Sequence, residues 1–168
     1  TIATITATPD SGYSFAEWTG IGVTDPSSPS TTINMTEARS ISATFTANQY
    51  SLTLSAGSGG NISGEGNFPH GTDATITASP SPGYSFAGWT GEGVNDLSSD
   101  STSVNMIENR SVYGSFSLVQ YGLNLSAGSG GNVTGEGNFS YNTNAQIIAS
   151  PKPGYTFLSL IHISEPTR

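Results

Sequence analysis

The feature that most limits how this chain can fold is an internal repeat with a period of 71 residues, the distance between Trp18 and Trp89. Aligned without insertion, the first 49 residues share 29 identities with the stretch that begins at Thr72. The 37 residues from Tyr50 share 25 identities with those from Tyr121. A repeat of this fidelity predicts a row of similar units by tandem duplication.

The period divides the chain into four parts. Residues 1–48 are the C-terminal part of a repeat, residues 49–119 are a complete repeat, and residues 120–157 are the N-terminal part of another. Residues 158–168 leave the pattern abruptly, because the tryptophan that follows "GYSF" in the two earlier copies is absent after "GYTF".

Within a unit, the hydrophobic pattern is that of short β-strands. In "YSLTLSA", Leu52 and Leu54 alternate with polar residues, which is the period of a half-buried strand. "TDATITAS", "SFAGW", "STSVNM" and "SVYGSF" follow, separated by Gly- and Pro-rich turns. No stretch carries an apolar stripe of helical length. We therefore predict an all-β fold of small antiparallel modules, each with roughly six strands.

A unit of 71 residues has a marginal core, and the chain has no cysteine that could form a disulfide. Large aromatic side chains are expected to supply most of the buried surface. The candidates in the complete unit are Tyr84, Phe86, Trp89 and Phe116.

An ordered set of these residues resembles a known family, the divergent B-repeat domain named after internalin. The frame is Tyr-x-Leu-x-Leu, a Gly-rich turn, Ala-x-Pro-x-x-Gly-Tyr-x-Phe-x-x-Trp, Val-x-Met and a closing Phe. It is formed by Tyr50, Leu52, Leu54, Ala78, Pro80, Gly83, Tyr84, Phe86, Trp89, Val104, Met106 and Phe116. The resemblance covers nearly all of residues 1–157, although the loop "EGVNDLSSDS" departs from it.

The resemblance implies β-grasp-like modules, arranged in strings on bacterial or archaeal surface or secreted proteins. It further implies a spacer or adhesion-stalk role, an extracellular or cell-surface location, neighbouring repeats as partners in cis, and no enzymatic activity. A glycan-binding or protein-binding adhesin segment is the alternative, with a glycan or a host or cell-surface protein bound through the parent chain.

The tail, Leu158–Arg168, has a different expected origin. A DNA string that resembles a transposase adapter used for sequencing libraries encodes it codon by codon. We interpret the tail as a translated read end of a metagenomic fragment and exclude it from the reasoning about the fold.

Composition excludes several classes of function. The formal net charge is −8 with only four Lys and Arg residues, so neither nucleic acid nor an anionic membrane surface is an expected partner. No apolar run is long enough to insert into a membrane. The absence of cysteine excludes thiolate metal sites and cysteine nucleophiles.

The sequence offers only weak evidence for a catalytic or ligand-binding site. Outside the tail the only histidine is His70, which the next copy replaces by Tyr141, and we interpret it as a surface-loop residue. "GSGGNISGEG" lacks the following helix that a phosphate loop needs. Asn95, Asp96 and Asp100 lie in one oxygen-rich loop, but their spacing matches no calcium motif.

Three pairs of carboxylates recur between copies, and a glycosidase would need two carboxylates facing one cleft. These are Asp25 with Asp96, Glu37 with Glu108, and Glu65 with Glu136. Trp18 and Trp89 could stack on sugars, but we interpret both as core residues. The sequence thus predicts no catalytic, cofactor-binding or metal-binding residue and no cofactor.

Overall fold

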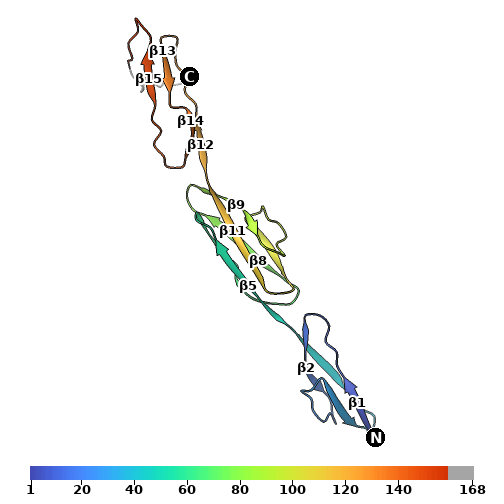
Figure 1. Ribbon diagram of the computed structural model, residues 1–168. Helices are drawn as coiled ribbons and strands as arrows, with labels where there is room; N and C mark the ends of the chain where they lie inside the picture. The colour runs from blue at the N-terminus through green and yellow to red at the C-terminus, as the bar shows by residue number, and fades with distance from the viewer. Residues whose placement is uncertain (159–168) are drawn as a thin grey trace, which may run out of the picture.

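The protein forms an extended row of three units in a computed structural model that describes residues 1–158 (Figure 1). This part contains strands and no helix, so the predicted tandem all-β fold is confirmed, and no helix here could cross a membrane. The tail assigned to residues 158–168 lies outside the described residues, except for Leu158, which is 90% exposed.

The complete unit contains seven strands rather than about six, because the Gly-rich stretch that follows the first strand forms two short strands of its own. The strands are β5 (Gln49–Ala56), β6 (Gly60–Ser63), β7 (Gly66–Pro69), β8 (Thr72–Pro80), β9 (Tyr84–Thr90), β10 (Ser101–Met106) and β11 (Arg110–Leu118).

These strands form two sheets. One has the order β7-β5-β11-β9, and the other has the order β10-β8-β6. Neighbouring strands are antiparallel except at the centre of the four-stranded sheet, where β5 and β11 run parallel. The first and last strands of the unit are therefore neighbours, an arrangement in keeping with the β-grasp-like expectation.

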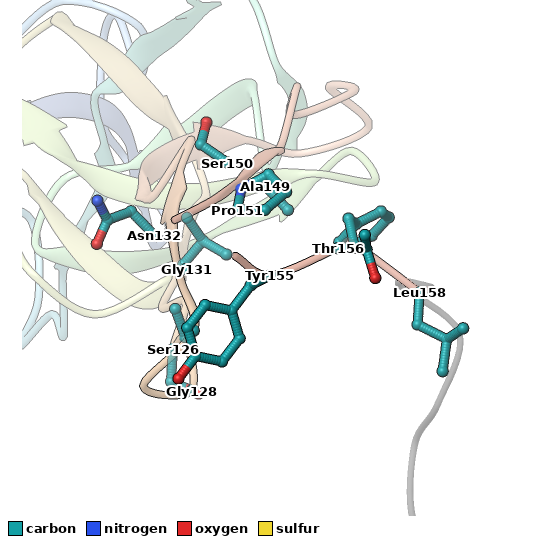
Figure 2. Close-up of a pocket in the computed structure, with 14 residues that line it drawn as sticks. Ser126, Gly128, Gly131, Asn132, Ala149, Ser150, Pro151, Tyr155, Thr156 and Leu158 are labelled. Atoms are coloured by element: carbon teal, nitrogen blue, oxygen red, sulfur yellow. The ribbon is translucent and has the colours of Figure 1, made fainter. Parts of the chain in front are cut away.

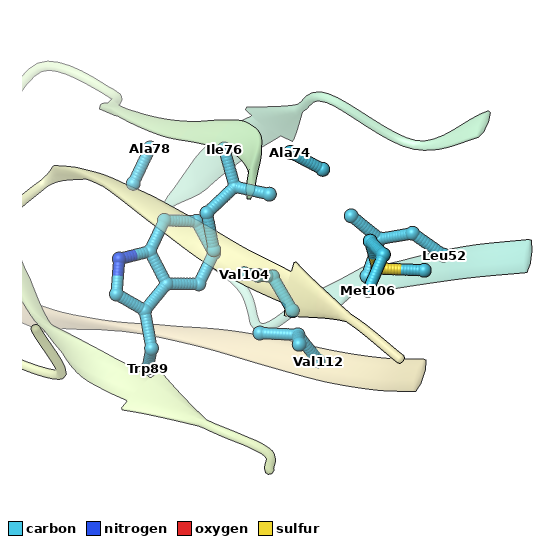
Figure 3. Packing of buried hydrophobic residues seen from close by; sticks show 8 residues of the cluster. All are labelled: Leu52, Ala74, Ile76, Ala78, Trp89, Val104, Met106 and Val112. Atoms are coloured by element: carbon cyan, nitrogen blue, oxygen red, sulfur yellow. The ribbon is translucent and has the colours of Figure 1, made fainter. Parts of the chain in front are cut away.

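The core lies between the two sheets and is mainly aliphatic (Figure 3). The largest fully buried side chains are Ile76, Val104, Met106 and Val112. Of the expected aromatic residues, Trp89 is 4% exposed, whereas Phe86 and Phe116 are only partly buried against the core. Tyr84 is half-buried outside the core cluster. The prediction that aromatic side chains dominate the core is therefore wrong, because Val, Ile and Met fill the narrow space between facing sheets.

A β-bulge explains the Phe-x-x-Trp spacing. Side chains three residues apart point to opposite faces of a regular strand. On β9, Ala87 has no partner on β11, although the residues on either side of it face consecutive residues. This extra residue turns Trp89 to the face of Phe86, where the ring centroids are 5.0 Å apart. The corresponding strand of the first unit has its bulge at Ala16.

The two flanking units contain matching parts of the same architecture. The first unit has β1 (Ile2–Thr6), β2 (Tyr13–Thr19), β3 (Ser30–Asn34) and β4 (Ser42–Ala47), paired as β1-β3 and β2-β4. The third unit has β12 (Gln120–Leu123), β13 (Gly131–Thr134), β14 (Gly137–Ser140) and β15 (Ile148–Pro151), paired as β12-β14 and β13-β15.

We expect Trp89→Ala to destabilise the complete unit by about 3–5 kcal/mol, through lost transfer free energy and the cavity left behind. Stability of about 0.05–0.15 kcal/mol per residue is typical, so this loss is comparable to the stability of the whole unit. Chemical denaturation of the full chain measures the effect. Ile107→Ala, at a position that is 48% exposed, is the control and should change little. Equal effects of the two substitutions would contradict the central role of Trp89.

Candidate functional site

The junctions between units are held by polar contacts outside the core. A single residue, Asn48, separates β4 from β5, and Val119 alone separates β11 from β12. The sequence suggests links of about four residues, "TANQ" and "SLVQ", but the outer residues of these stretches belong to the strands. The last strand of one unit thus runs almost directly into the first strand of the next (Figure 1).

At the first junction, backbone hydrogen bonds hold Asn48 to both neighbours. Its N–H donates to the carbonyl of Gly12 in the first unit at 2.8 Å. Its carbonyl accepts from the N–H of His70 in the complete unit, also at 2.8 Å. The hydroxyl of Ser14 donates to Oδ1 of Asn48 at 2.6 Å. Because the N–H and the carbonyl of Asn48 are both hydrogen-bonded, one unit has little freedom to change its orientation relative to the next.

The second junction repeats this arrangement. The N–H of Val119 donates to the carbonyl of Gly83 at 2.8 Å, and its carbonyl accepts from the N–H of Tyr141 at 2.9 Å. Each linking residue is therefore bonded to a glycine behind it and an aromatic residue ahead of it. Because the same contacts recur, the geometry belongs to the repeat and not to one particular pair of units.

Side-chain packing explains why glycine is required at these turns. A Cβ atom on Gly12 would overlap the His70 ring, and one on Gly83 would overlap the Tyr141 ring. The φ angles of the two glycines, 82° and 83°, also lie in the left-handed region that other residues avoid. Each glycine thus permits both the turn and the close approach of the next unit.

His70 occupies a structural position at the first junction. Its ring lies edge-on to Tyr13 of the preceding unit and to Tyr50 of its own, with centroids 6.1 and 5.9 Å away. Its Nδ1 is buried without a hydrogen-bond partner among the described residues. No described carboxylate is bonded to it, as a catalytic triad would require. The sequence interpretation of a simple surface-loop histidine missed this contact between units.

The tryptophans lie under the long loop that follows them. Nε1 of Trp89 donates to the carbonyl of Ser99 at 2.8 Å, and Nε1 of Trp18 donates to that of Ser28 at 3.0 Å. Trp89 is buried, as expected of a core residue, and Trp18 is half-buried. Since a sugar-stacking platform needs an exposed ring face, the Trp89 ring does not provide one.

The carboxylate of Asp96 organises the same loop. Its Oδ1 accepts hydrogen bonds from Oγ of Ser98 at 2.7 Å, from N of Ser98 at 2.8 Å and from N of Ser99 at 3.2 Å. These bonds, that of the Ser98 hydroxyl first, favour the ionised form and lower the pKa of Asp96 below its ordinary value of 3.8. Ser27 lowers the pKa of Asp25 in the same way.

The other candidate carboxylates serve separate local contacts. Glu108 forms an ion pair with Arg110 at 2.8 Å, and Glu37 forms one with Arg39 at 3.4 Å. Glu65 and Glu136 are exposed between short strands. Within residues 1–158, no group of three or more His, Asp or Glu side chains is placed to hold a metal ion.

Two residues of the oxygen-rich loop that was considered for calcium make other hydrogen bonds. Asn95 donates from Nδ2 to Oγ of Ser103 at 2.6 Å, and the backbone carbonyl of Asp100 accepts from N of Ala78 at 2.7 Å. The Gly-rich string "GSGGNISGEG" forms a turn, β6 and the approach to β7, with no helix after it. The contacts in this loop hold its backbone in place and indicate a structural role.

We expect Gly12→Ala and Gly83→Ala to loosen the junctions, because each added methyl group meets an aromatic ring of the next unit. Amide hydrogen exchange at Asn48 and Val119 should become faster. Gly154→Ala is the matched control: its φ of 86° imposes the same turn strain, but no atom lies within 4 Å of the added methyl group. Unchanged protection of both amides would contradict the steric argument.

A second expectation concerns how the hydrogen bonds of the Asp96 carboxylate depend on pH. A carboxylate with a lowered pKa contributes stability above its unfolded pKa and loses it as the pH falls through the folded value. We therefore expect the amides of Ser98 and Ser99 to keep their hydrogen bonds to Asp96 down to pH 3.8 and to lose them only below that pH. Asp96→Asn should remove this dependence, and Asp100→Asn in the same loop should retain it. An NMR titration that follows the amide signals of Ser98 and Ser99 measures the midpoint of this change. A midpoint above pH 3.8 would contradict the expectation.

Comparison with known proteins agrees with the repeat. A family model, the divergent InlB B-repeat domain, matches residues 1–49, 50–120 and 121–165. The third match includes residues 158–165, so the adapter origin of the tail stays a prediction. No curated protein and no solved structure matches the chain. Repeats of this family occur in bacterial surface proteins. With nearly its whole length matched, the chain belongs to the divergent InlB B-repeat domain family.

Proposed function

We propose that the chain is a length of non-catalytic, semi-rigid stalk within a larger prokaryotic secreted or cell-surface protein. The observation that carries the proposal is the one-residue junction, whose linking residue is hydrogen-bonded to the units on both sides. A spacer must keep the parts at its ends apart, and a short, fully bonded link resists the bending that a flexible linker would allow.

The direction of the chain through the complete unit also supports this role. Because β5 and β11 are parallel, the chain enters at one end of the unit and leaves at the other. Successive units therefore add length instead of folding back, and the first and third units lie at opposite ends of the row (Figure 1). The net charge of −8 opposes collapse of the row onto itself.

An adhesin segment that binds a glycan or a protein is the alternative function. Burial of Trp89 weighs against sugar stacking at that residue, and the exposed carboxylates serve local ion pairs and turns. Titration with oligosaccharides under Trp fluorescence distinguishes the two: a saturable spectral change would favour the adhesin.

Spin-label distances test the stalk directly. The chain has no cysteine, so Thr4→Cys and Thr75→Cys, at equivalent exposed positions of adjacent units, can be labelled without other changes. We expect a single narrow distance distribution, because Asn48 is bonded on both sides. Inserting a short Gly-Ser segment after Asn48 should broaden it. A native distribution as broad as that of the insertion variant would overturn the semi-rigid stalk.

A further inference from the structure

An open cavity of about 400 Å³ in the third unit is a feature of the repeat (Figure 2). Gly131 lines it, and the equivalent residue in the complete unit is Gly60. A Cβ atom on Gly60 would meet the Phe116 ring of β11, so a strand of the repeat fills this place in the complete unit. The cavity therefore corresponds to the position of a strand and not to a site for a ligand.

The two junctions differ in a single ring, and only the first has a ring that can take up a proton near neutral pH. His70 and Tyr141 hold equivalent positions, directly after β7 and β14. Their backbone N–H groups donate to the carbonyls of the linking residues, Asn48 and Val119, at 2.8 and 2.9 Å. Each ring also lies against a glycine of the preceding unit. The junctions therefore share their geometry and differ in the chemistry of this ring.

The groups in contact with the His70 ring carry no charge. One edge of the ring, with Cδ2 and Nε2, lies against the backbone of Gly12. The rings of Tyr13 and Tyr50 stand edge-on to it, with centroids 6.1 and 5.9 Å away. Its Nδ1 is buried and has no hydrogen-bond partner among the described residues. The ring is thus held by packing alone.

The carboxylates on the elements around this ring are engaged elsewhere or exposed. On β8, Oδ1 of Asp73 accepts from Nδ2 of Asn105 at 3.0 Å. Glu108 pairs with Arg110 at 2.8 Å, and Asp10 is exposed in the turn that leads into β2. Strand β5 has no charged residue. Every ion pair within residues 1–158 involves an arginine, so none of them would neutralise a charge on the ring.

Protonation changes what this position requires. A neutral imidazole has one donor nitrogen and one acceptor nitrogen, whereas the protonated ring has two donors and a charge. At the junction, an N–H group at Nδ1 of His70 is buried without an acceptor, which costs free energy. That nitrogen reaches water only if the ring leaves its contacts with Gly12 and the two tyrosines. The open junction therefore binds the proton better than the closed one, and the closed junction loses stability as the pH falls.

We propose that the first junction is a pH-sensitive joint, in which protonation of His70 releases the contact between the first unit and the complete unit. The second junction, with Tyr141 in the same place, stays closed over the same range. Histidine is the side chain whose charge changes between about pH 5 and about pH 8. This regulation rests on the proposed stalk role: a row that is semi-rigid at neutral pH bends at one defined point in mild acid.

Amide hydrogen exchange of the full chain tests the joint, once the rates are corrected for the intrinsic dependence of exchange on pH. Between about pH 8 and about pH 5, the protection of the Asn48 and His70 amides should fall about tenfold, because a buried donor is left without a partner. The amides of Val119 and Tyr141 are the internal control and should keep their protection.

Exchanging the two rings separates protonation from damage to the fold. His70→Tyr gives the first junction the ring of the second, and it should abolish the pH dependence. Tyr141→His should transfer the dependence to the amides of Val119 and of position 141. Asp10→Asn removes the carboxylate of the neighbouring turn and should leave the dependence unchanged.

Spin labels distinguish failure of the joint from failure of the stalk. With labels at Thr4→Cys and Thr75→Cys, the distance distribution should be narrow at about pH 8 and broad at about pH 5. A distribution that is narrow at both values contradicts the joint and leaves the stalk standing. One that is already broad at the higher value overturns the stalk and the joint with it.

The exchange data can also overturn the joint. Protection of the Asn48 amide that rises in acid would show that the charged ring is attracted to the tyrosine faces and tightens the junction. A His70→Tyr chain that stays pH-dependent, a Tyr141→His chain without the dependence, or loss of the dependence in Asp10→Asn would each contradict the proposal as well.

Discussion

The parallel pairing of β5 with β11 is the contact on which the rest of the unit depends. It joins the hairpin-like pair β5-β7 to the pair β9-β11, and so makes one sheet broad enough to cover the β10-β8-β6 sheet. Leu52 on β5 and Val112 on β11 both belong to the buried core that this sheet covers. Since the core of a unit this small is marginal, closure of this sheet is what lets the unit bury enough apolar surface to be stable.

The repeat and its strand pattern predict much of this architecture. The period predicts tandem repeats, which the family match confirms, and the alternation in "YSLTLSA" predicts a strand that the structure places at Gln49–Ala56. The interpretation of Trp89 as a core residue is also correct. These features are accessible because they depend on local periodicity and on comparison of the chain with itself.

The remaining features depend on contacts between distant residues. Pairing of β5 with β11 joins strands at opposite ends of the unit, and no turn motif marks it. The junction role of His70 arises from the preceding unit, through Gly12, Tyr13 and Asn48. One signal was available in the sequence: the position after "GNFP" or "GNFS" carries a ring in both copies, His70 and Tyr141. The bulge at Ala87 could similarly have been inferred, because a core Phe and Trp three residues apart require an extra residue between them.

The parallel central pair has a mechanical consequence for a chain held at both ends. Tension enters the complete unit at the start of β5 and leaves it at the end of β11, and these points lie at opposite ends of neighbouring strands. To extend the unit, the force must slide the two strands past each other. The hydrogen bonds along their five facing residue pairs then resist the pull together, whereas a hairpin pulled from its open end releases its bonds one after another. A row of such units resists tension in shear, and its lifetime under force is set by the rate of unfolding.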